Sequence, residues 1–213
     1  MRIVTISREF GSGGRELGKR IAEYLGYDYY DREIINSIAE NCGVNADYAK
    51  YMLNHSFPPT VSLTMRQSFH MPEMIQSSQL QLLREQTDVI KNIAKKGRDC
   101  VIIGRNADIL LAEYKPFNIF VCADVNTKLL RCAERAANGE NITAKEMFTK
   151  MKQIDKARRK AREMIADTPW GDRKAYNLIV NSSGWDFKKL TPCVSAVITQ
   201  WFDAQTEEAD ANK

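Results

Sequence analysis

The sequence lacks long apolar runs. No stretch reaches the roughly 18–20 apolar residues that a membrane-spanning helix requires, and the first residues lack the basic, then apolar, then small-residue order of a secretory signal. The chain begins directly with a strand-like segment. We therefore expect a protein that makes no membrane contact and stays in the cytoplasm.

The cysteines have no recognisable spacing. The five cysteines are odd in number and form neither a C-x-x-C pair nor a pattern with histidine. The sequence therefore indicates neither a disulfide framework nor a zinc site.

A large excess of one charge is also missing. The net charge is only +4, and no run clusters basic residues with aromatic ones. We expect no nucleic-acid partner, because proteins that bind nucleic acids usually carry a marked basic patch. An anionic small molecule fits this mild positive charge better.

What the sequence does contain is an alternation of short strands and long helices. Short, mostly β-branched runs predict strands at residues 2–6, 27–30, 100–103, 118–122 and 177–180. Helical patterns lie at residues 15–25, 32–41, 46–53, 72–96, 126–137, 144–165 and 187–202. Continuous apolar strands between helices are typical of a doubly wound α/β fold, in which helices cover both faces of a parallel sheet.

The length of 213 residues fits one domain, which we expect to span residues 1–205. The polar residues 206–213 are predicted to form a frayed tail. Residues 56–71 contain two prolines and few periodic apolar positions, so they are predicted to form a loop or a mobile excursion.

The most informative local feature is a glycine-rich turn, Phe10-Gly11-Ser12-Gly13-Gly14, between the first strand and the first helix. A strand, a glycine-rich turn and a helix N-terminus gather several backbone N–H groups around one point, where the positive end of the helix dipole also lies. The natural occupant of such a turn is a phosphate group.

The lysine of the common phosphate-binding loop is absent, because Gly14 and Arg15 occupy the positions of its lysine and the following Ser or Thr. Arg15 is the nearest replacement, since a guanidinium group can grip two phosphate oxygens. The Ser12 hydroxyl could donate to the anion, and Glu16 could orient a hydrated metal ion. The alternative is a simple tight turn followed by a solvated Arg15.

A second feature is the apolar strand at 100–103, which ends in Gly104-Arg105. In an open parallel sheet, ligands bind beyond the carboxyl ends of the strands. We therefore expect Arg105 to face a ligand cleft, and a structural salt bridge is the alternative.

A third feature is the basic segment at residues 143–163, which has eight basic and three acidic side chains. Thr143 and Glu146 match a capping box and predict the start of its helix. Asp155, Arg158 and Arg159 suit a lid that neutralises a phosphoryl group during transfer. A solvated helix face is the alternative explanation for such a charged run.

Several motifs follow one another in a specific order. They are Ile6-Ser7-Arg8-Glu9-Phe10-Gly11-Ser12-Gly13-Gly14-Arg15-Glu16-Leu17-Gly18, Tyr30-Asp31-Arg32-Glu33-Ile34-Ile35, Gly104-Arg105, Asp155-Lys156-Ala157-Arg158-Arg159, and Trp170-Gly171-Asp172 with Tyr176-Asn177-Leu178-Ile179-Val180-Asn181. Together they resemble the cytidylate kinase-like proteins of bacteria over residues 1–200. The resemblance implies a P-loop NTPase-type sheet of five parallel strands, with a nucleoside monophosphate-binding region at about 32–97 and a helical lid at about 138–172.

The resemblance also implies roles for individual residues. It places Gly11, Ser12, Gly13, Gly14, Arg15 and Glu16 at the ATP loop, Asp31, Arg105 and Asp155 on the acceptor side, and Arg158 and Arg159 in the lid.

This sequence departs from the family pattern at several positions. Besides the missing lysine, Ser37 stands where an acceptor-binding arginine is expected, and Asn106 stands where an acid is expected. The resemblance therefore supports the fold more strongly than it supports CMP as the substrate.

The sequence thus predicts a phosphotransferase that uses ATP and Mg²⁺ and acts on a nucleoside monophosphate. Two alternatives stay open: a nucleotide-binding regulatory protein without transfer activity, and a kinase of a non-nucleotide metabolite, since one fold serves several acceptors.

Overall fold

Five parallel strands form the centre of the molecule. The computed structural model describes residues 1–54, 71–135 and 142–211. The strands are β1 (Ile3–Arg8), β2 (Asp28–Tyr30), β3 (Cys100–Ile103), β4 (Phe117–Cys122) and β5 (Leu178–Asn181). They lie in the order β2-β3-β1-β4-β5, and each pairing between neighbours is parallel. The predicted α/β class and five-stranded parallel sheet are confirmed.

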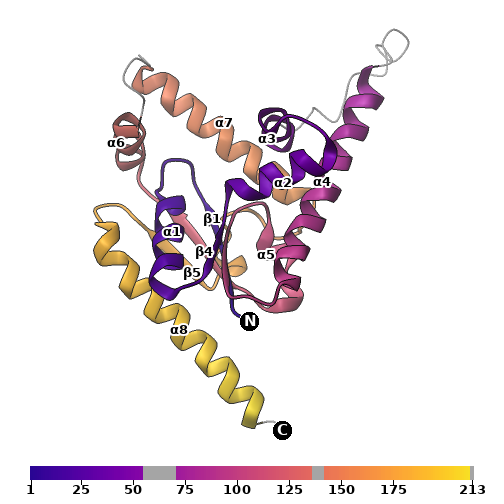
Figure 1. Ribbon diagram of the computed structural model, residues 1–213. Helices are drawn as coiled ribbons and strands as arrows, with labels where there is room; N and C mark the ends of the chain where they lie inside the picture. The colour runs from indigo at the N-terminus through magenta and orange to yellow at the C-terminus, as the bar shows by residue number, and fades with distance from the viewer. Residues whose placement is uncertain (55–70, 136–141, 212–213) are drawn as a thin grey trace.

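Helices surround this sheet (Figure 1). They are α1 (Gly14–Leu25), α2 (Arg32–Cys42), α3 (Ala46–Asn54), α4 (Met71–Lys95), α5 (Ala107–Leu110), α6 (Val125–Arg135), α7 (Ala144–Glu163) and α8 (Phe187–Ala211), with single 3₁₀ turns at Ala112–Tyr114 and Arg173–Ala175.

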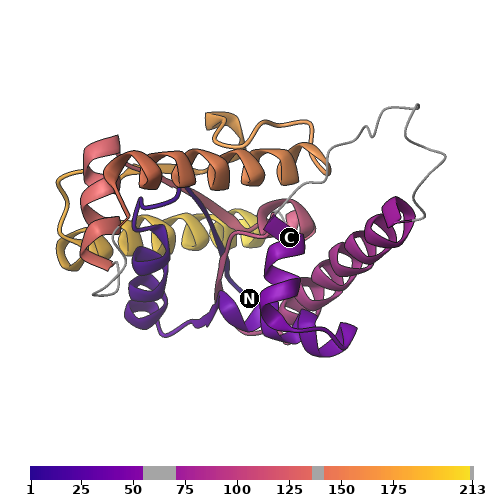
Figure 2. The same ribbon diagram turned by 90° about the horizontal axis from the view of Figure 1, so that it is seen from above.

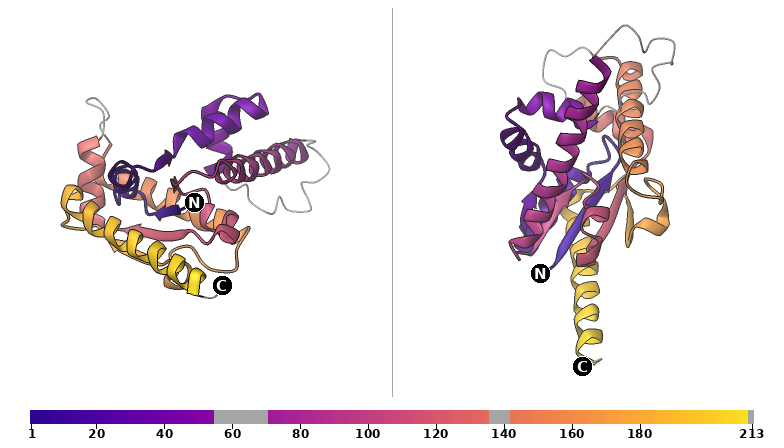
Figure 3. Two further views of the ribbon diagram at one scale, coloured as in Figure 1. Left: turned by 60° about the horizontal axis from the view of Figure 1, so that its bottom comes forward. Right: turned by 90° about the vertical axis from the view of Figure 1, so that its right-hand side faces the viewer.

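The helices cover the two faces of the sheet separately, as the left view of Figure 3 shows. One core joins Ile3 of β1 to α2, α3 and α4, and the other joins Val4 of β1 to α1 and α8. Adjacent residues enter different cores because successive side chains of a strand point to opposite faces. All four residues of β3 are buried, as the continuous apolar run predicted.

Helix α7 lies across the end of the sheet at which the glycine-rich turn follows β1 (Figure 2). Its predicted capping box is confirmed: the Thr143 hydroxyl accepts from the Glu146 N–H, and the Glu146 carboxylate accepts from the Thr143 N–H at 2.8 Å. The basic segment is therefore one continuous helix above the edge where the sequence predicts ligand binding.

The end of α8 differs from the prediction. We expected this helix to end at Phe202, but it continues to Ala211 and projects from the body of the molecule (Figure 3, right). The residues after Phe202 contain neither Gly nor Pro and are rich in good helix formers. The frayed tail predicted from Thr206 is therefore helical up to Ala211.

The short helix α5 and the segment at residues 56–71 also bear on the sequence predictions. The pattern did not indicate α5, because its four residues are too few to show a helical period. The predicted excursion at 56–71 falls outside the described residues, apart from Met71, which begins α4.

Among the described helices, none combines the length and the apolar character needed to cross a bilayer.

Candidate functional site

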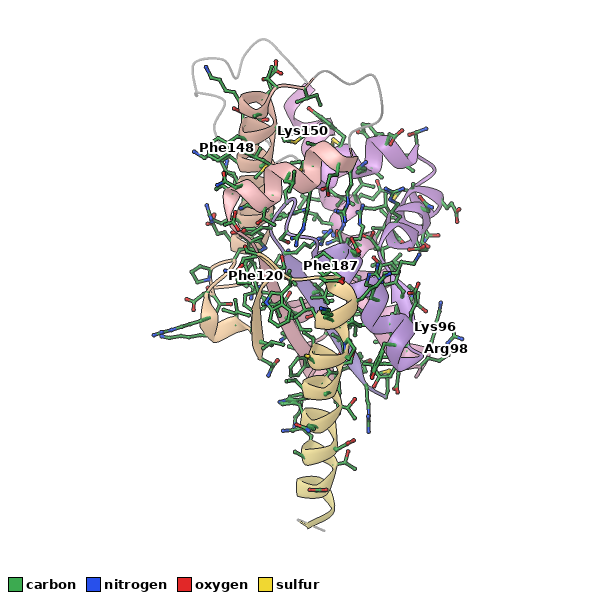
Figure 4. All side chains as sticks on the ribbon, turned by 90° about the vertical axis from the view of Figure 1, so that its left-hand side faces the viewer. Lys96, Arg98, Phe120, Phe148, Lys150 and Phe187 are labelled. Carbon is green, nitrogen blue, oxygen red and sulfur yellow. The ribbon has the colours of Figure 1, made fainter. Side chains whose placement is uncertain are left out.

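A pocket of about 310 Å³ opens beside the glycine-rich turn, and we call it the loop pocket. It is lined by Arg8, Glu9, Phe10, Gly11, Gly13, Gly14, Arg15, Arg131, Cys132, Arg135, Ile142, Met147, Lys150 and Arg158. Six of these side chains are basic and only Glu9 is acidic. In Figure 4, Lys150 marks α7 above this region and Phe187 marks the start of α8 below it. The balance of charge favours an anionic ligand.

The turn leaves the first N–H groups of α1 unpaired. Gly13 is the N-cap, has the left-handed φ of 78° and provides no side-chain cap. A β-carbon at Gly13 would overlap the Phe187 ring. This position therefore requires glycine for two reasons, its positive φ and the close approach of Phe187. Within the described residues, the N–H groups of Gly13, Gly14, Arg15 and Glu16 have no acceptor. Such donors, at the positive end of the helix dipole, are suited to bind phosphate.

The carbonyl of Ser12 is held on the other side of the turn. It accepts from the Ser182 hydroxyl at 2.6 Å and from Arg131 Nη1 at 3.0 Å. The peptide bond to Gly13 is trans, so its C=O and N–H point in opposite directions. The two donors therefore turn the Gly13 N–H away from Ser182.

Two predicted ligand-binding groups already have partners. The Ser12 hydroxyl donates to the carbonyl of Glu9 at 2.9 Å. The Glu16 carboxylate pairs with Arg20 at 3.1 Å and with Arg135 at 2.5 Å. In this arrangement, neither group is free to contact a phosphate or a metal ion.

Four arginines gather around Asp31, whose side chain is only 9% exposed at the end of β2. Arg15 Nε lies 2.5 Å from one carboxylate oxygen of Asp31, and Arg8 Nη2 lies 4.0 Å from the other. Arg105 and Arg158 are near enough to repel the Arg8 charge. We call Arg8, Arg15, Arg105 and Arg158 the arginine cluster.

Crowding and burial shift the titration of this cluster. Burial, followed by repulsion from Arg158, lowers the pKa of Arg105 to about 10. The same two causes lower the pKa of Arg8 well below its usual value. An anion placed among these groups would offset their repulsion, so the cluster favours a phosphorylated ligand.

The backbone after β3 is strained where it presents Arg105. Gly104, Arg105 and Asn106 have φ values of 68°, 60° and 54°. Two consecutive non-glycine residues in the left-handed region are unusual and are found mainly at functional sites. A β-carbon at Gly104 would overlap the Arg8 guanidinium, so the glycine lets Arg8 and Arg105 lie in one cluster.

Asp155 joins α7 to the glycine-rich turn. Its carboxylate accepts from the Phe10 N–H at 2.8 Å and from Arg158 Nη1 at 2.9 Å, and Arg158 also donates to the Arg8 carbonyl at 2.9 Å. Burial raises the pKa of Asp155, against the opposing effect of Arg158. Asp155 and Arg158 thus hold α7 against the turn.

Arg159 is not brought to this site. It is exposed on α7, and its guanidinium lies 5.9 Å from the centre of the Trp170 ring. Adjacent helical residues point in directions about 100° apart, so Arg158 and Arg159 face different surroundings.

Sequence reasoning missed three contributors to the site: Arg8, Arg131 and Ser182. The predicted first strand ended at Ile6, so Arg8 was not placed at a carboxyl end, although β1 extends to it. Arg131 and Ser182 meet the turn only through tertiary structure. The one available signal was Arg8 itself, a basic residue directly before the glycine-rich turn.

The described residues offer no preformed metal site. Within them, no three His, Cys, Asp or Glu side chains are grouped to hold an ion. Glu9 pairs with Lys128 at 2.9 Å, while Asp31 and Glu16 are also paired. A Mg²⁺ ion at this pocket would have to rely on ligand phosphates and water for most of its coordination.

Comparison with known proteins agrees with the fold. Residues 3–184 match the model of the cytidylate kinase-like family. The cytidylate kinase of Pyrococcus horikoshii is 26% identical over 200 residues, covering 92% of this chain and 88% of the relative. The cytidylate kinase of Haloarcula marismortui is 22% identical over 185 residues, covering 86% and 82%.

Solved structures share the architecture. An uncharacterized protein from Eubacterium ventriosum superposes with a TM-score of 0.68 at 23% identity, covering 93% of this chain and 99% of that one. Shikimate kinase from Bacteroides thetaiotaomicron gives a TM-score of 0.55 at 12% identity, covering 93% and 98%. These likenesses establish the fold, and the family match extends over most of the sequence. The chain belongs to the cytidylate kinase-like family.

Proposed function

We propose that the protein is an ATP-dependent phosphotransferase that moves the γ-phosphoryl group of ATP onto a nucleoside monophosphate such as CMP. The observation that carries this proposal is the loop pocket, in which unpaired N–H groups of α1 adjoin guanidinium groups of the arginine cluster. Family membership and relatives named cytidylate kinase support a nucleotide as the acceptor.

Phosphoryl transfer mainly requires that the protein align the donor and the acceptor and place positive charge around the transferring group. The transferring group passes through a loose transition state with its charge spread over three oxygens, so the protein supplies alignment and cations more than covalent chemistry. In our proposal, the N–H groups of Gly13 and Gly14, together with Arg15, hold the donor phosphates. Arg105 holds the acceptor phosphate, and Arg158 lies between the two.

Asp31 has a definite place in this proposal. It is the carboxylate that pairs with Arg15 and lies near Arg8 in this structure. A ligand phosphate would compete with Asp31 for the same guanidinium groups. Binding of the nucleotides therefore has to break or share the pair between Arg15 and Asp31.

The apolar side chains of the loop pocket have a further task. Phe10, Ile142 and Met147 give the loop pocket an apolar part, which would help to exclude water that otherwise hydrolyses ATP. Mg²⁺ would neutralise phosphate charge and enter bound to the nucleotide. Arg159 lies on the outer side of α7, so its participation would require this helix to turn.

The test is a transfer assay with a panel of nucleoside monophosphates and with the variant Arg158→Ala. We expect kcat to fall by about 10²–10³, because loss of a cation that acts in the transition state costs about 3–4 kcal/mol. The Kd for ATP should change much less. Arg159→Ala, one residue away and outside the pocket, is the matched control and should keep its activity.

Equal losses of kcat and of ATP affinity in Arg158→Ala would contradict this proposal for Arg158. The missing lysine favours one second candidate, a nucleotide-binding regulatory protein. Tight ATP binding without product for any acceptor in the panel would select that candidate instead.

A further inference from the structure

Arg8 occupies the space in which the side chain of the missing lysine would begin. The lysine of a common phosphate-binding loop would stand at position 14, which is Gly14 here. A β-carbon built on Gly14 would lie 2.6 Å from Cβ of Arg8 and 3.2 Å from its Cγ. A side chain at position 14 and the stem of Arg8 therefore exclude each other.

The head of Arg8 is held at the same site. Its side chain is only 17% exposed, and it lines the loop pocket together with Gly13, Gly14 and Arg158. The absence of a β-carbon at Gly104 makes room for its guanidinium group. Two glycines, one in the turn and one after β3, thus shape the space that Arg8 fills.

Among the described residues, Arg8 pairs only with Asp31, and only at long range. Asp31 is 4.0 Å from Arg8 Nη2 but only 2.5 Å from Arg15 Nε. A buried guanidinium without a close counter-ion is costly unless a ligand anion completes its surroundings. Arg15, by contrast, is 51% exposed and already paired.

We infer that Arg8, entering from the end of β1, supplies the cation that binds the terminal donor phosphates in place of the loop lysine. This inference rests on the proposed function, because it assumes that a nucleoside triphosphate occupies the loop pocket. It assigns the principal side-chain contact with the donor phosphates to Arg8, and the contact of Arg15, which is exposed and paired with Asp31, becomes the secondary one.

The inference is tested by moving the charge from one position to the other. ATP binding to the full chain is measured by calorimetry for wild type, Arg8→Gly, the double variant Arg8→Gly/Gly14→Lys and the double variant Arg8→Gly/Gly14→Ala. Removing Arg8 should weaken ATP binding by about tenfold to a hundredfold, the usual effect of losing a charge-assisted hydrogen bond.

Lysine at position 14 should then restore at least part of the affinity, because Arg8→Gly removes the closest obstacle to its stem. The remaining neighbour, Cβ of Val121 at 3.1 Å, has to shift by only a few tenths of an ångström. Alanine at position 14 makes the same backbone change without the charge and should restore nothing. A purely structural role for Arg8 would not produce rescue by lysine alone. Thermal unfolding of each variant shows that the compared chains are folded.

Unchanged ATP binding in Arg8→Gly, or equal rescue by lysine and alanine, would overturn the inference while leaving the transferase proposal standing. Rescue by lysine in a protein that binds ATP but transfers nothing would support the inference and overturn the transferase. Failure of the wild-type chain to bind ATP would overturn both.

Discussion

At the scale of single residues, Arg105 adopts an unfavourable backbone conformation, and this conformation places its charge at the site. Its φ of 60° lies in the left-handed region, which costs a residue with a side chain about 1–2 kcal/mol. The neighbouring Asn106 has the same kind of conformation, and its side chain donates to the Ala161 carbonyl of α7 at 3.1 Å. The strained turn is thus held by α7 and by the strand before it.

Two substitutions of Arg105 distinguish the effect of its backbone strain on stability from the effect of its charge on binding. Arg105→Gly and Arg105→Ala both remove the guanidinium group and should weaken binding of the acceptor nucleotide equally. Glycine tolerates positive φ, so Arg105→Gly should be more stable than Arg105→Ala by about 1 kcal/mol. Urea unfolding measures the difference, and an alanine variant as stable as the glycine variant would contradict the account of strain.

Asp155 gives a prediction about pH. Folding raises its pKa, mainly through burial, so the folded chain binds the proton more tightly than the unfolded chain. The stability that this protonation contributes is fully present below the unfolded pKa of about 3.9 and is lost as the pH rises through the raised folded pKa.

The variant Asp155→Asn stays neutral at all these pH values. Its free energy of unfolding, relative to that of wild type, should therefore increase between about pH 4 and pH 7. Urea unfolding at both ends of this range checks the sign. A difference that is independent of pH would show that folding leaves the pKa of Asp155 unchanged, and a change in the opposite direction would show that the fold favours its ionised form.

At the scale of elements, α7 is fixed to the body by a buried ion pair. Arg162 is 1% exposed, and its Nη1 lies 2.5 Å from Asp108 of α5. Its Nε donates to the Thr168 carbonyl at 2.8 Å. Helix α7 therefore has one end tied by Arg162 and its middle tied to the glycine-rich turn by Asp155.

Arg162→Met should lower the free energy of unfolding by about 3–5 kcal/mol, because it leaves Asp108 as an unpaired buried carboxylate. Arg159→Met is the matched control on the same helix. It removes one exposed cation–π contact and should cost at most about 1 kcal/mol. Similar losses for the two variants in urea unfolding would show that the buried pair does not anchor α7.

At the scale of the whole molecule, the fold was more predictable than the site. All five strands were predicted to within two residues at each end, because each is rich in apolar or aromatic residues. The central strands β1, β3 and β4 are mostly buried and therefore lack a regular polar alternation that could mislead a sequence pattern. The end of α8 and the short α5 were not predicted, because neither depends on an apolar period. The predicted division into an acceptor-binding region and a lid stays a prediction.

The site was predicted in its parts but not in its connections. The glycine-rich turn, Arg105 and Arg158 were each identified, and the structure brings them to one end of the sheet. The pairing of Arg15 with Asp31 and the overlap of Arg8 with position 14 depend on side-chain directions in three dimensions. The two residues between the predicted end of the first strand, Ile6, and the end of β1, Arg8, are enough to hide such a contact.

The central claim is that main-chain N–H groups at the start of α1, with guanidinium groups in place of the usual lysine, bind the phosphates of ATP. The most direct measurement is a titration of the ¹⁵N-labelled chain with ATP and Mg²⁺, following the amide resonances of Gly13 and Gly14 by NMR. The account predicts saturable downfield shifts of both amide protons as they donate to phosphate oxygens. ATP binding that leaves both resonances unmoved, or no binding at all, would contradict it.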